Sequence, residues 1–345
     1  MHVLILIPRI DKSGPVKGAL ALFNGLLKNN IKVTLLPLNK SQNVNDNNLY
    51  SKDLINERSF LSKIARLRNI RSKLSKSGKL IIISYCFKPD LLIFLSGLNK
   101  HSISSLRGNL FENYYLDYGF FGKIFALFHY TISLTHSKIV VLNSSMLNTL
   151  RLFEKKVLVI ENFIDEPVLD YNKNQTENLI SFIFVGGLTK RKAIVELLDI
   201  ARNLKDKKYK FELHVLGDGP EMNNVLLKID KLGLKDSVFL HGLVDNTFDY
   251  LVKSHVFVLP SYSEGTSRAA MEALYAGLPC VMRDVDSNSE LINDNNGILC
   301  RNTNEIENAM RHYIKNPPFE KKCLLNPPYR QQIGVLKFLD VIENL

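Results

Sequence analysis

Residues 256–277 read VFVLPSYSEGTSRAAMEALYAG. The four apolar residues at the start of this stretch, closed by Pro260, predict a buried strand followed by a turn. Thr266 or Ser267 can cap a helix that the alanine-rich sequence propagates and that Gly277 ends. The stretch is therefore predicted to form a strand, a polar loop and the N-terminus of a helix.

This arrangement is suited to binding an anion. Ligands of open α/β sheets bind outside the carboxyl ends of the strands, and a helix N-terminus offers a phosphate unpaired N–H groups. Gly265 allows a ligand to approach the backbone, and Arg268 can form a charge-assisted hydrogen bond with a diphosphate. Two carboxylates, Glu264 and Glu272, flank these residues with seven positions between them.

With its Pro-Ser turn, Glu-Gly pair and Ala-Gly-Leu-Pro ending, the stretch resembles the Glu-x7-Glu element of retaining glycosyltransferases of family 4, which have the GT-B fold. The resemblance implies that Glu264 contacts the donor sugar and that Glu272 binds the ribose hydroxyls of the nucleotide. The other donor-binding residues of this element would be Gly265, Thr266, Ser267 and Arg268. The alternative is a surface helix with two solvated glutamates, in which Glu272 pairs with Arg268 at the i, i+4 spacing.

A chain of 345 residues is long enough for two domains. Both halves alternate strand and helix patterns, which predicts two doubly wound Rossmann-like α/β domains. The resemblance implies the GT-B arrangement, in which the domains face a cleft and the C-terminal helix crosses back to the first domain. The expected parts are an acceptor-binding domain over 1–165, a linker over 166–178, a nucleotide-sugar-binding domain over 179–325 and the C-terminal helix over 326–345.

Residues 180–192 read ISFIFVGGLTKRK and resemble the strand of this family that is followed by a Gly-Arg-Leu…Lys element. In the family, the Arg and the Lys hold the donor diphosphate and neutralise the leaving group. Lys192 falls at the Lys position, whereas Gly187 occupies the Arg position. Arg191 or Arg268 would then supply the missing charge; without the resemblance, the three basic residues would be interpreted as a solvated helix start.

Three further loops have counterparts in the family. Gly217 and Gly219, after a strand at 211–216, resemble the turn that lines the nucleotide pocket, although such a turn is also an ordinary helix start. Leu243 lies in a loop whose counterpart in the family meets the base. Gly14, after the first strand, resembles the glycine loop near the donor phosphates, and a plain βα turn is the alternative.

Arg107 follows a strand at 102–106, where many relatives have a His that faces the anomeric centre. Its predicted role is to contact the diphosphate or the acceptor, and the alternative is a plain loop arginine. Together with Glu264, Lys192 and Arg191, it completes the set of predicted catalytic residues. His129 and His136 are interpreted as helix and loop residues without a partner visible in the sequence.

Residues 1–165 hold 23 Lys and Arg against 10 Asp and Glu, a net charge of +13 in a chain of +11. The first half is therefore expected to face something anionic. Arg58–Lys79 has eight basic residues, no acid and apolar residues at helical spacing. It could be an amphipathic helix on an anionic membrane or a core-packed helix with a solvated basic face. No nucleic-acid motif is present, so nucleic acid is not expected as a partner.

No metal or other cofactor is expected. The four cysteines are scattered without metal-ligand spacing, which indicates reduced thiols in a cytosolic protein. Asp284 and Asp286 mimic the metal-binding DxD motif of a different fold, but GT-B enzymes stabilise the leaving group with cations and helix dipoles. Neither a signal peptide nor a run of about 18 apolar residues is seen. The expected location is the cytoplasm, including the inner face of the membrane.

The resemblance implies transfer of a hexose or N-acetylhexosamine, with retention of configuration, from a nucleoside-diphosphate sugar to a hydroxyl of a glycan acceptor. A UDP-sugar is favoured over a GDP-sugar. The acceptor is expected to be lipid-linked, in surface-polysaccharide synthesis such as capsule or O-antigen. The alternatives are a GT-B nucleotide-sugar epimerase or hydrolase, and a catalytically weak scaffold subunit of a glycan-assembly complex.

Overall fold

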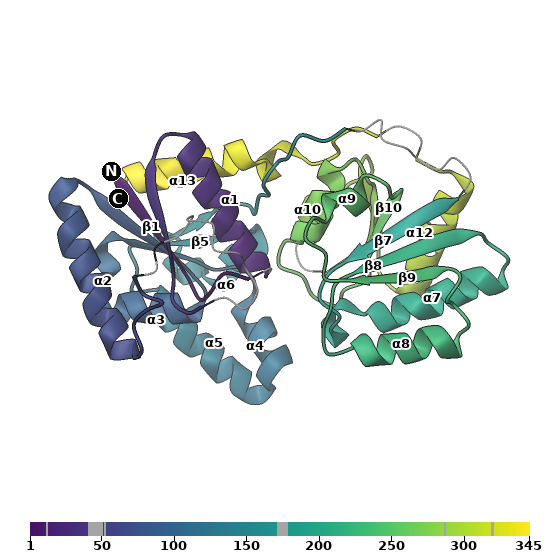
Figure 1. The fold of residues 1–345 in the computed structure, drawn as a ribbon, viewed down its shortest axis with the longest axis horizontal. Coiled ribbons are helices and arrows are strands. Elements are labelled where there is room, and N and C mark those ends of the chain that lie inside the picture. The colour runs from purple at the N-terminus through teal and green to yellow at the C-terminus, as the bar shows by residue number, and fades with distance from the viewer. Residues whose placement is uncertain (12, 41–50, 52, 171–178, 286–287, 319–320) are drawn as a thin grey trace. The chain divides into compact units, whose positions relative to one another are not determined.

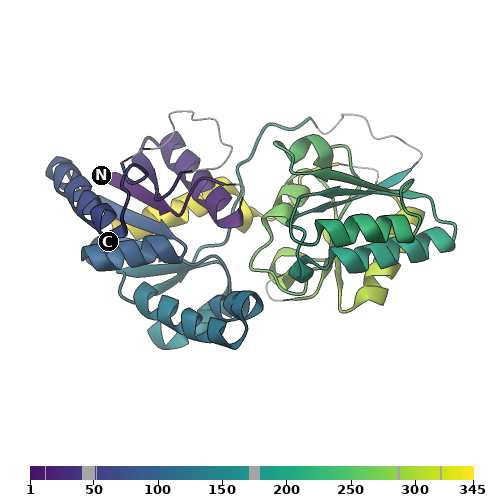
Figure 2. The same cartoon turned by 60° about the horizontal axis from the view of Figure 1, so that its bottom comes forward.

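The structure, a computed structural model, describes residues 1–11, 13–40, 51, 53–170, 179–285, 288–318 and 321–345. The linker positions 171–178 and Asp286 lie outside the described residues. The chain divides into two compact units (Figures 1 and 2). One comprises Met1–Asp165 with Pro327–Leu345, and the other comprises Glu166–Asn326.

The first unit contains a six-stranded parallel sheet in the order β2-β1-β3-β4-β5-β6. Its strands are β1 His2–Ile7, β2 Lys32–Pro37, β3 Leu80–Tyr85, β4 Ser102–Ser105, β5 Lys138–Val141 and β6 Val157–Val159. Its helices are α1 Gly14–Lys28, α2 Phe60–Leu74, α3 Phe87–Ser96, α4 Leu110–Tyr118, α5 Phe120–Ser133, α6 Ser144–Thr149 and α13 Gln331–Glu343.

Strand β1 shows why this sheet has helices on both faces. Successive side chains of a strand point to opposite faces. Val3 and Ile5 pack with α1 and α13, whereas Leu4 and Leu6 pack with α2 and α3. Because the strand is apolar at every one of these positions, both faces must be covered, as is typical of parallel sheets.

The C-terminal helix α13 is part of the first unit and lies beside α1 (Figure 1). A Cβ added at Gly25 of α1 would lie only 2.3 Å from the Val335 side chain. Gln331 accepts a hydrogen bond from Lys28 Nζ at 2.9 Å and donates one to the Ala21 carbonyl at 2.9 Å. Close apolar packing and these two hydrogen bonds hold the two ends of the sequence together.

The second unit also contains a six-stranded parallel sheet, in the order β12-β11-β10-β7-β8-β9. Its strands are β7 Ile180–Val185, β8 Phe211–Leu216, β9 Val238–Gly242, β10 Val256–Leu259, β11 Cys280–Arg283 and β12 Gly297–Cys300. Its helices are α7 Ile194–Asp206, α8 Met222–Lys231, α9 Phe248–Leu251, α10 Arg268–Tyr275, α11 Asn288–Leu291 and α12 Thr303–Lys315. The prediction of two Rossmann-like α/β domains is confirmed. The strand order of the second unit reverses between β7 and β10, and ligands of such sheets bind at this switch point.

Helix α2 is the structural form of the basic segment Arg58–Lys79. Its apolar side is packed into the core: Leu67 is fully buried, and Ile64 and Ile70 contact the same cluster. Arg68 Nε donates to the Ser96 carbonyl at 3.0 Å, which ties the helix to the end of α3. The helical spacing of apolar residues here therefore reflects core packing. Of the two alternatives, the structure supports the core-packed helix, because the apolar side of α2 is not free to face a membrane.

Candidate functional site

The predicted strand, loop and helix at 256–277 are all present. Strand β10 ends at Leu259, and α10 begins at Arg268. Ser267 is the N-cap, with extended backbone and a side-chain oxygen that accepts a hydrogen bond from Ala270 N at 3.3 Å. Gly277 has φ +83°, a conformation that favours glycine at the end of a helix. The loop and the N-terminus of α10 thus lie at the carboxyl end of a central strand.

Strand β7 leads to the second half of the site. It is followed by a single turn, Lys190–Lys192, which ends at Ala193 with φ +52°. Lys192 Nζ lies 2.5 Å from Glu264 Oε1, and both side chains are largely buried, with 14% and 6% of their surface exposed. Because β7 and β10 are neighbours in the sheet, the loops that follow them meet at the switch point.

Arg191 makes a second set of contacts between the same loops. Its Nη1 donates to the Ser263 carbonyl at 2.7 Å and lies 4.0 Å from Glu264 Oε2. Its own carbonyl accepts a hydrogen bond from Tyr262 N at 2.9 Å. Two cations therefore surround one carboxylate beside the positive end of the α10 dipole. This excess of positive charge is suited to an anionic ligand.

Glu272, the second glutamate of the motif, is also buried, with 6% of its surface exposed. It lies on α10, and its Oε2 accepts a hydrogen bond from Thr247 Oγ1 at 3.0 Å. Glu264 is 7% exposed. The alternative of two solvated glutamates on a surface helix is therefore wrong. Each carboxylate has a defined polar neighbour instead, which fixes its position in the site.

Glycines shape the loop between β8 and α8. Gly217 has φ +138°, and a Cβ there would lie 1.9 Å from the Gly186 carbonyl oxygen. A Cβ at Gly219 would lie 2.4 Å from the Leu188 carbonyl oxygen. The loops after β7 and β8 therefore interlock by backbone contact, in a way that a side chain at either position would prevent. By contrast, a Cβ at Gly187 would lie no closer than 3.8 Å to a neighbouring atom, so this position does not require glycine.

The loop after β9 joins the same cluster. Gly217 N donates to the Gly242 carbonyl at 2.7 Å, and the next residue, Leu243, is largely exposed. His241 on β9 lies beside His214 on β8, with 3.0 Å between His241 Nε2 and His214 Nδ1. Burial, followed by the charge of His214, lowers the pKa of His241. Within the described parts of the chain, no cluster of His, Cys, Asp and Glu could hold a metal ion.

Arg283 also contributes to the site, although the sequence did not predict it. Arg283 on β11 donates from Nε to the Pro260 carbonyl at 3.0 Å, and its Nη2 lies 2.7 Å from Glu196 Oε2. Its guanidinium also lies 5.0 Å from the centre of the Tyr262 ring. Arg283 therefore holds the loop after β10 through its contacts with Pro260 and Tyr262. No sequence motif singles out this residue, because its partners lie on other elements.

Two buried hydroxyls in the loops after β7 and β10 of the second unit have no hydrogen-bond partner among the described residues. They are Ser261 Oγ, after β10, and Thr189 Oγ1, after β7. Buried polar atoms are usually hydrogen-bonded, so these two hydroxyls are available to a ligand. Both belong to loops that end at the switch point.

Gly14 and Arg107, which were also predicted as site residues, belong to the first unit. Gly14 opens α1. The Arg107 guanidinium lies 4.4 Å from the centre of the Tyr85 ring, and Nη1 donates to Asn162 Oδ1 at 3.4 Å. In the described part of the chain, Nε and Nη2 of Arg107 have no hydrogen-bond partner. Arg107 is therefore held by ring stacking and retains free donors at the carboxyl end of β4.

His129 lies in a helix and His136 in a loop, as predicted, and the two share a partner that the sequence does not reveal. His129 Nε2 lies 3.0 Å from Asp90 Oδ2, and His136 Nε2 lies 3.7 Å from Asp90 Oδ1. Ser104 Oγ donates to the same carboxylate at 2.9 Å. All four side chains are buried. The group was not visible in the sequence because α3, β4, α5 and the loop after α5 bring together residues that lie 14 to 46 positions from Asp90.

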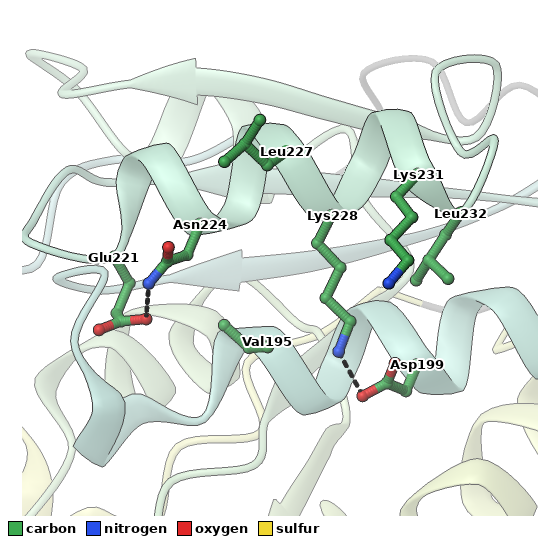
Figure 3. Close-up of a pocket in the computed structure, with 8 residues that line it drawn as sticks. All are labelled: Val195, Asp199, Glu221, Asn224, Leu227, Lys228, Lys231 and Leu232. Carbon is green, nitrogen blue, oxygen red and sulfur yellow. Dashed lines mark hydrogen bonds and ion pairs between the residues drawn. The ribbon is translucent and has the colours of Figure 1, made fainter.

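A surface hollow of about 480 Å³ lies between α7 and α8 (Figure 3). An ion pair between Lys228 Nζ and Asp199 Oδ2, 2.6 Å apart, crosses it, and Asn224 donates to Glu221 at 2.9 Å. None of the residues that line it belongs to the predicted donor site. The hollow is therefore a separate surface feature.

The family match lies in the second unit. Residues 169–326 match the family described as Glycosyl transferases group 1. An uncharacterized glycosyltransferase of Methanocaldococcus jannaschii is 25% identical over 292 residues, which cover 75% of this chain and 68% of the relative. The Escherichia coli UDP-Gal:alpha-D-GlcNAc-diphosphoundecaprenol alpha-1,3-galactosyltransferase is 28% identical over 137 residues. That alignment covers 38% of this chain and 35% of the relative, so it spans about a third of each protein.

Solved structures resemble the chain over its whole length. The lipopolysaccharide outer core galactosyltransferase WaaB, in its apo form, has a TM-score of 0.71 at 15% identity, with 100% of both chains covered. Anabaena HepE in complex with UDP-glucose has a TM-score of 0.75 at 14% identity, also with 100% of both chains covered. At these identities the likeness concerns the fold, which is GT-B.

Proposed function

Because residues 169–326 match the family of glycosyl transferases group 1, we propose that this protein is a glycosyltransferase that uses a nucleoside-diphosphate sugar as donor. The sugar is a hexose or an N-acetylhexosamine, and it is transferred to a hydroxyl of a glycan acceptor. The E. coli relative is named for UDP-Gal, and HepE was solved with UDP-glucose. These two names favour a UDP-sugar over a GDP-sugar.

The contact between Lys192 and Glu264 is the observation that carries this proposal. It places a cation and a carboxylate at the switch point of the second sheet, beside the N-terminus of α10. Departure of a sugar leaves growing negative charge on the diphosphate, and preorganised cations and N–H groups stabilise such charge. Lys192 and Arg191 are the cations in position to do so, and Arg191 is already anchored on the Ser263 carbonyl.

The proposed reaction retains the anomeric configuration. The bond between the anomeric carbon and the diphosphate oxygen breaks, and the acceptor oxygen bonds to the same face of that carbon. The departing phosphate oxygen takes the proton of the acceptor hydroxyl, so no protein nucleophile and no metal are required. In this scheme Glu264 contacts the sugar ring and Glu272 binds the ribose hydroxyls, held in position by Thr247.

The first unit is proposed to bind the acceptor. Arg107 has free donors at the carboxyl end of β4, where the edge of a parallel sheet accepts ligands. The E. coli relative is named for an acceptor on diphosphoundecaprenol, and WaaB is named for the lipopolysaccharide outer core. We accordingly propose a lipid-linked glycan acceptor in surface-polysaccharide synthesis, at the cytoplasmic face of the membrane.

One observation favours a second candidate, a scaffold subunit with weak activity. Gly187 stands where the family has an arginine that holds the diphosphate, and no neighbouring atom makes glycine necessary there. A protein that has lost this cation could still bind the nucleotide through Glu272 and the N-terminus of α10. Such a protein would bind UDP without turning over a UDP-sugar.

The two candidates are separated by incubating the protein with UDP-glucose, UDP-galactose and their N-acetyl forms. Release of UDP would be followed with a coupled assay, and the anomeric carbon by NMR. Slow hydrolysis, or transfer with retained configuration, supports the glycosyltransferase. Binding without any turnover supports the scaffold, and the appearance of a free 2-epimerised sugar would assign the protein to the epimerases instead.

A further inference from the structure

Helices α4 and α5 form a hairpin whose outer side is apolar. Eight large side chains there are each at least 50% exposed. They form what we term the aromatic face: Tyr115, Tyr118, Phe120, Phe121, Ile124, Phe125, Leu127 and Phe128. Figure 2 shows α4 and α5 at one side of the first unit, and Figure 1 shows them at the same end. Soluble surfaces rarely gather so many exposed apolar residues without a binding role.

The aromatic face is not a core surface that has been left uncovered, because the opposite side of α5 is fully packed. A Cβ at Gly122 would lie 1.9 Å from the Tyr114 carbonyl oxygen, so the two helices touch by backbone. Ala126 is completely buried, and His129 reaches Asp90 in the interior. The hairpin is therefore fixed in orientation by its inner side, and its outer side is exposed.

The composition of α5 fits the interface of a bilayer. Its 14 residues contain one lysine and no other formally charged residue. The Lys123 ammonium lies 5.1 Å from the centre of the Tyr115 ring, at the border of the aromatic face. Aromatic side chains and a lysine of this kind are typical of helices that lie in the plane of a membrane interface. Within the described residues, no helix is both long and apolar enough to cross a bilayer.

Charge decides between the possible occupants of the aromatic face. The first unit, residues 1–165 with 327–345, holds 25 Lys and Arg against 12 Asp and Glu, a net charge of +13. A second copy of the chain would bring an equal positive charge to the contact. An anionic lipid surface would bring the opposite charge and would also take up the aromatic side chains.

We propose that the aromatic face of α4 and α5 docks this protein on an anionic phospholipid bilayer. The basic excess of the first unit attracts it to the surface, and insertion of the aromatic side chains between the lipid headgroups holds it there. The basic segment Arg58–Lys79 contributes mainly charge, since most of its apolar residues, such as Ile64, Leu67 and Ile70, pack into the core. Helix α4 follows β4 and Arg107 directly, so docking places the carboxyl edge of the first sheet near the lipid.

The test is sedimentation with sucrose-loaded vesicles, using full-length protein and no donor. Vesicles of phosphatidylcholine alone are compared with vesicles that contain about a quarter phosphatidylglycerol. The double variant Phe120→Gln, Phe121→Gln removes two of the most exposed members of the aromatic face. The matched control is Leu61→Gln, Leu152→Gln, which removes two exposed apolar side chains elsewhere in the same unit. Circular dichroism and thermal melting confirm that both variants are folded.

The expected result is binding of the wild type to the anionic vesicles, weakened by salt. The aromatic variant should lose at least about tenfold in partition, and the leucine control should bind like the wild type. Equal partition of the two variants would overturn the proposal, as would equal binding to uncharged vesicles. Self-association that the aromatic variant abolishes, without vesicle binding, would instead assign the face to a protein interface. Because no sugar donor is used, the result is independent of whether the proposed glycosyltransfer is correct.

Discussion

Lys192 and Glu264 are 72 positions apart in the sequence, yet Lys192 Nζ lies 2.5 Å from Glu264 Oε1. The contact exists because β7 and β10 are neighbours at the point where the strand order of the second sheet reverses. Each residue comes from the loop that follows its strand, so both lie at the edge where ligands bind. Neither side chain is freely solvated, and the pair therefore forms a prearranged charged site.

Replacing Lys192 with alanine tests its role at the leaving group. If Lys192 stabilises charge that develops on the diphosphate, kcat should fall by about 10²-fold or more while the nucleotide Kd changes less. Lys190→Ala is the matched control, since Lys190 lies in the same turn and is exposed. Steady-state kinetics and titration with UDP measure the two effects. Near-normal turnover in Lys192→Ala would reject this role.

Glu272→Ala should weaken binding of UDP, because a ribose hydroxyl would lose its carboxylate acceptor. Loss of one hydrogen bond to a charged group corresponds to about tenfold in Kd. Thr247→Val should have a smaller effect in the same direction, since Thr247 only positions the carboxylate. Calorimetric titration checks both, with the exposed Asp294→Ala as control. An unchanged affinity in Glu272→Ala would exclude contact with the ribose.

Arg283 is expected to stabilise the second unit and to position the loop after β10. Arg283→Ala leaves Glu196 without its cation and the Pro260 carbonyl without a donor, which should cost about 2–4 kcal/mol of unfolding free energy. Arg283→Lys keeps the charge but loses the forked geometry and should cost less. Urea denaturation followed by circular dichroism compares the variants. Equal stability of Arg283→Ala and the wild type would show that the contacts are not important for stability.

A pair of glycines tests the interlocked loops. Gly217→Ala combines a strained backbone with a contact of 1.9 Å to the Gly186 carbonyl oxygen, so it should destabilise the second unit by at least about 1–3 kcal/mol. Gly187→Ala is its control, because a Cβ there has 3.8 Å of space. Thermal melting with and without UDP measures stability and binding together. Equal melting temperatures for the two variants would contradict the interlocked geometry.

The buried group around Asp90 predicts acid lability of the first unit. Burial raises the pKa of Asp90, but the His129 hydrogen bond and the charges of His136 and His129 outweigh this effect, so the pKa is lowered. Burial also lowers the pKa of His136, in spite of Asp90. Both folded groups hold protons less tightly than in the unfolded chain, where their pKa values are near 3.8 and 6.5. Stability should therefore be complete above about pH 6.5 and should fall as the pH drops below it.

Hydrogen exchange followed by mass spectrometry localises this effect, after correction for the intrinsic exchange rate at each pH. Between pH 7 and pH 5, protection should fall in β3, β4 and α5 more than in the second unit. His136→Gln cannot titrate and should flatten this dependence. A uniform loss of protection over both units would argue against a role for the Asp90 group.

Much of the second unit could be predicted from sequence. The strand at Val256–Leu259, the cap at Ser267 and the helix end at Gly277 follow from local preferences, because each depends on neighbours within one turn. The two Rossmann-like domains follow from the alternation of strands and helices. By contrast, the partners of His129 and the support that Arg283 gives the loop depend on residues that only the sheet brings close.

The sequence by itself determined where the strands, caps and turns lie, and it identified Glu264, Glu272 and Lys192 by their resemblance to a family motif. The tertiary structure alone decided which side of each helix is used in packing. Helices α2 and α5 of the first unit both contain many apolar residues, but α2 packs its apolar side into the core, whereas α5 leaves Phe120 and Phe121 exposed. The spacing of apolar residues along a helix does not show whether they are buried or exposed. That depends on which other elements pack against the helix.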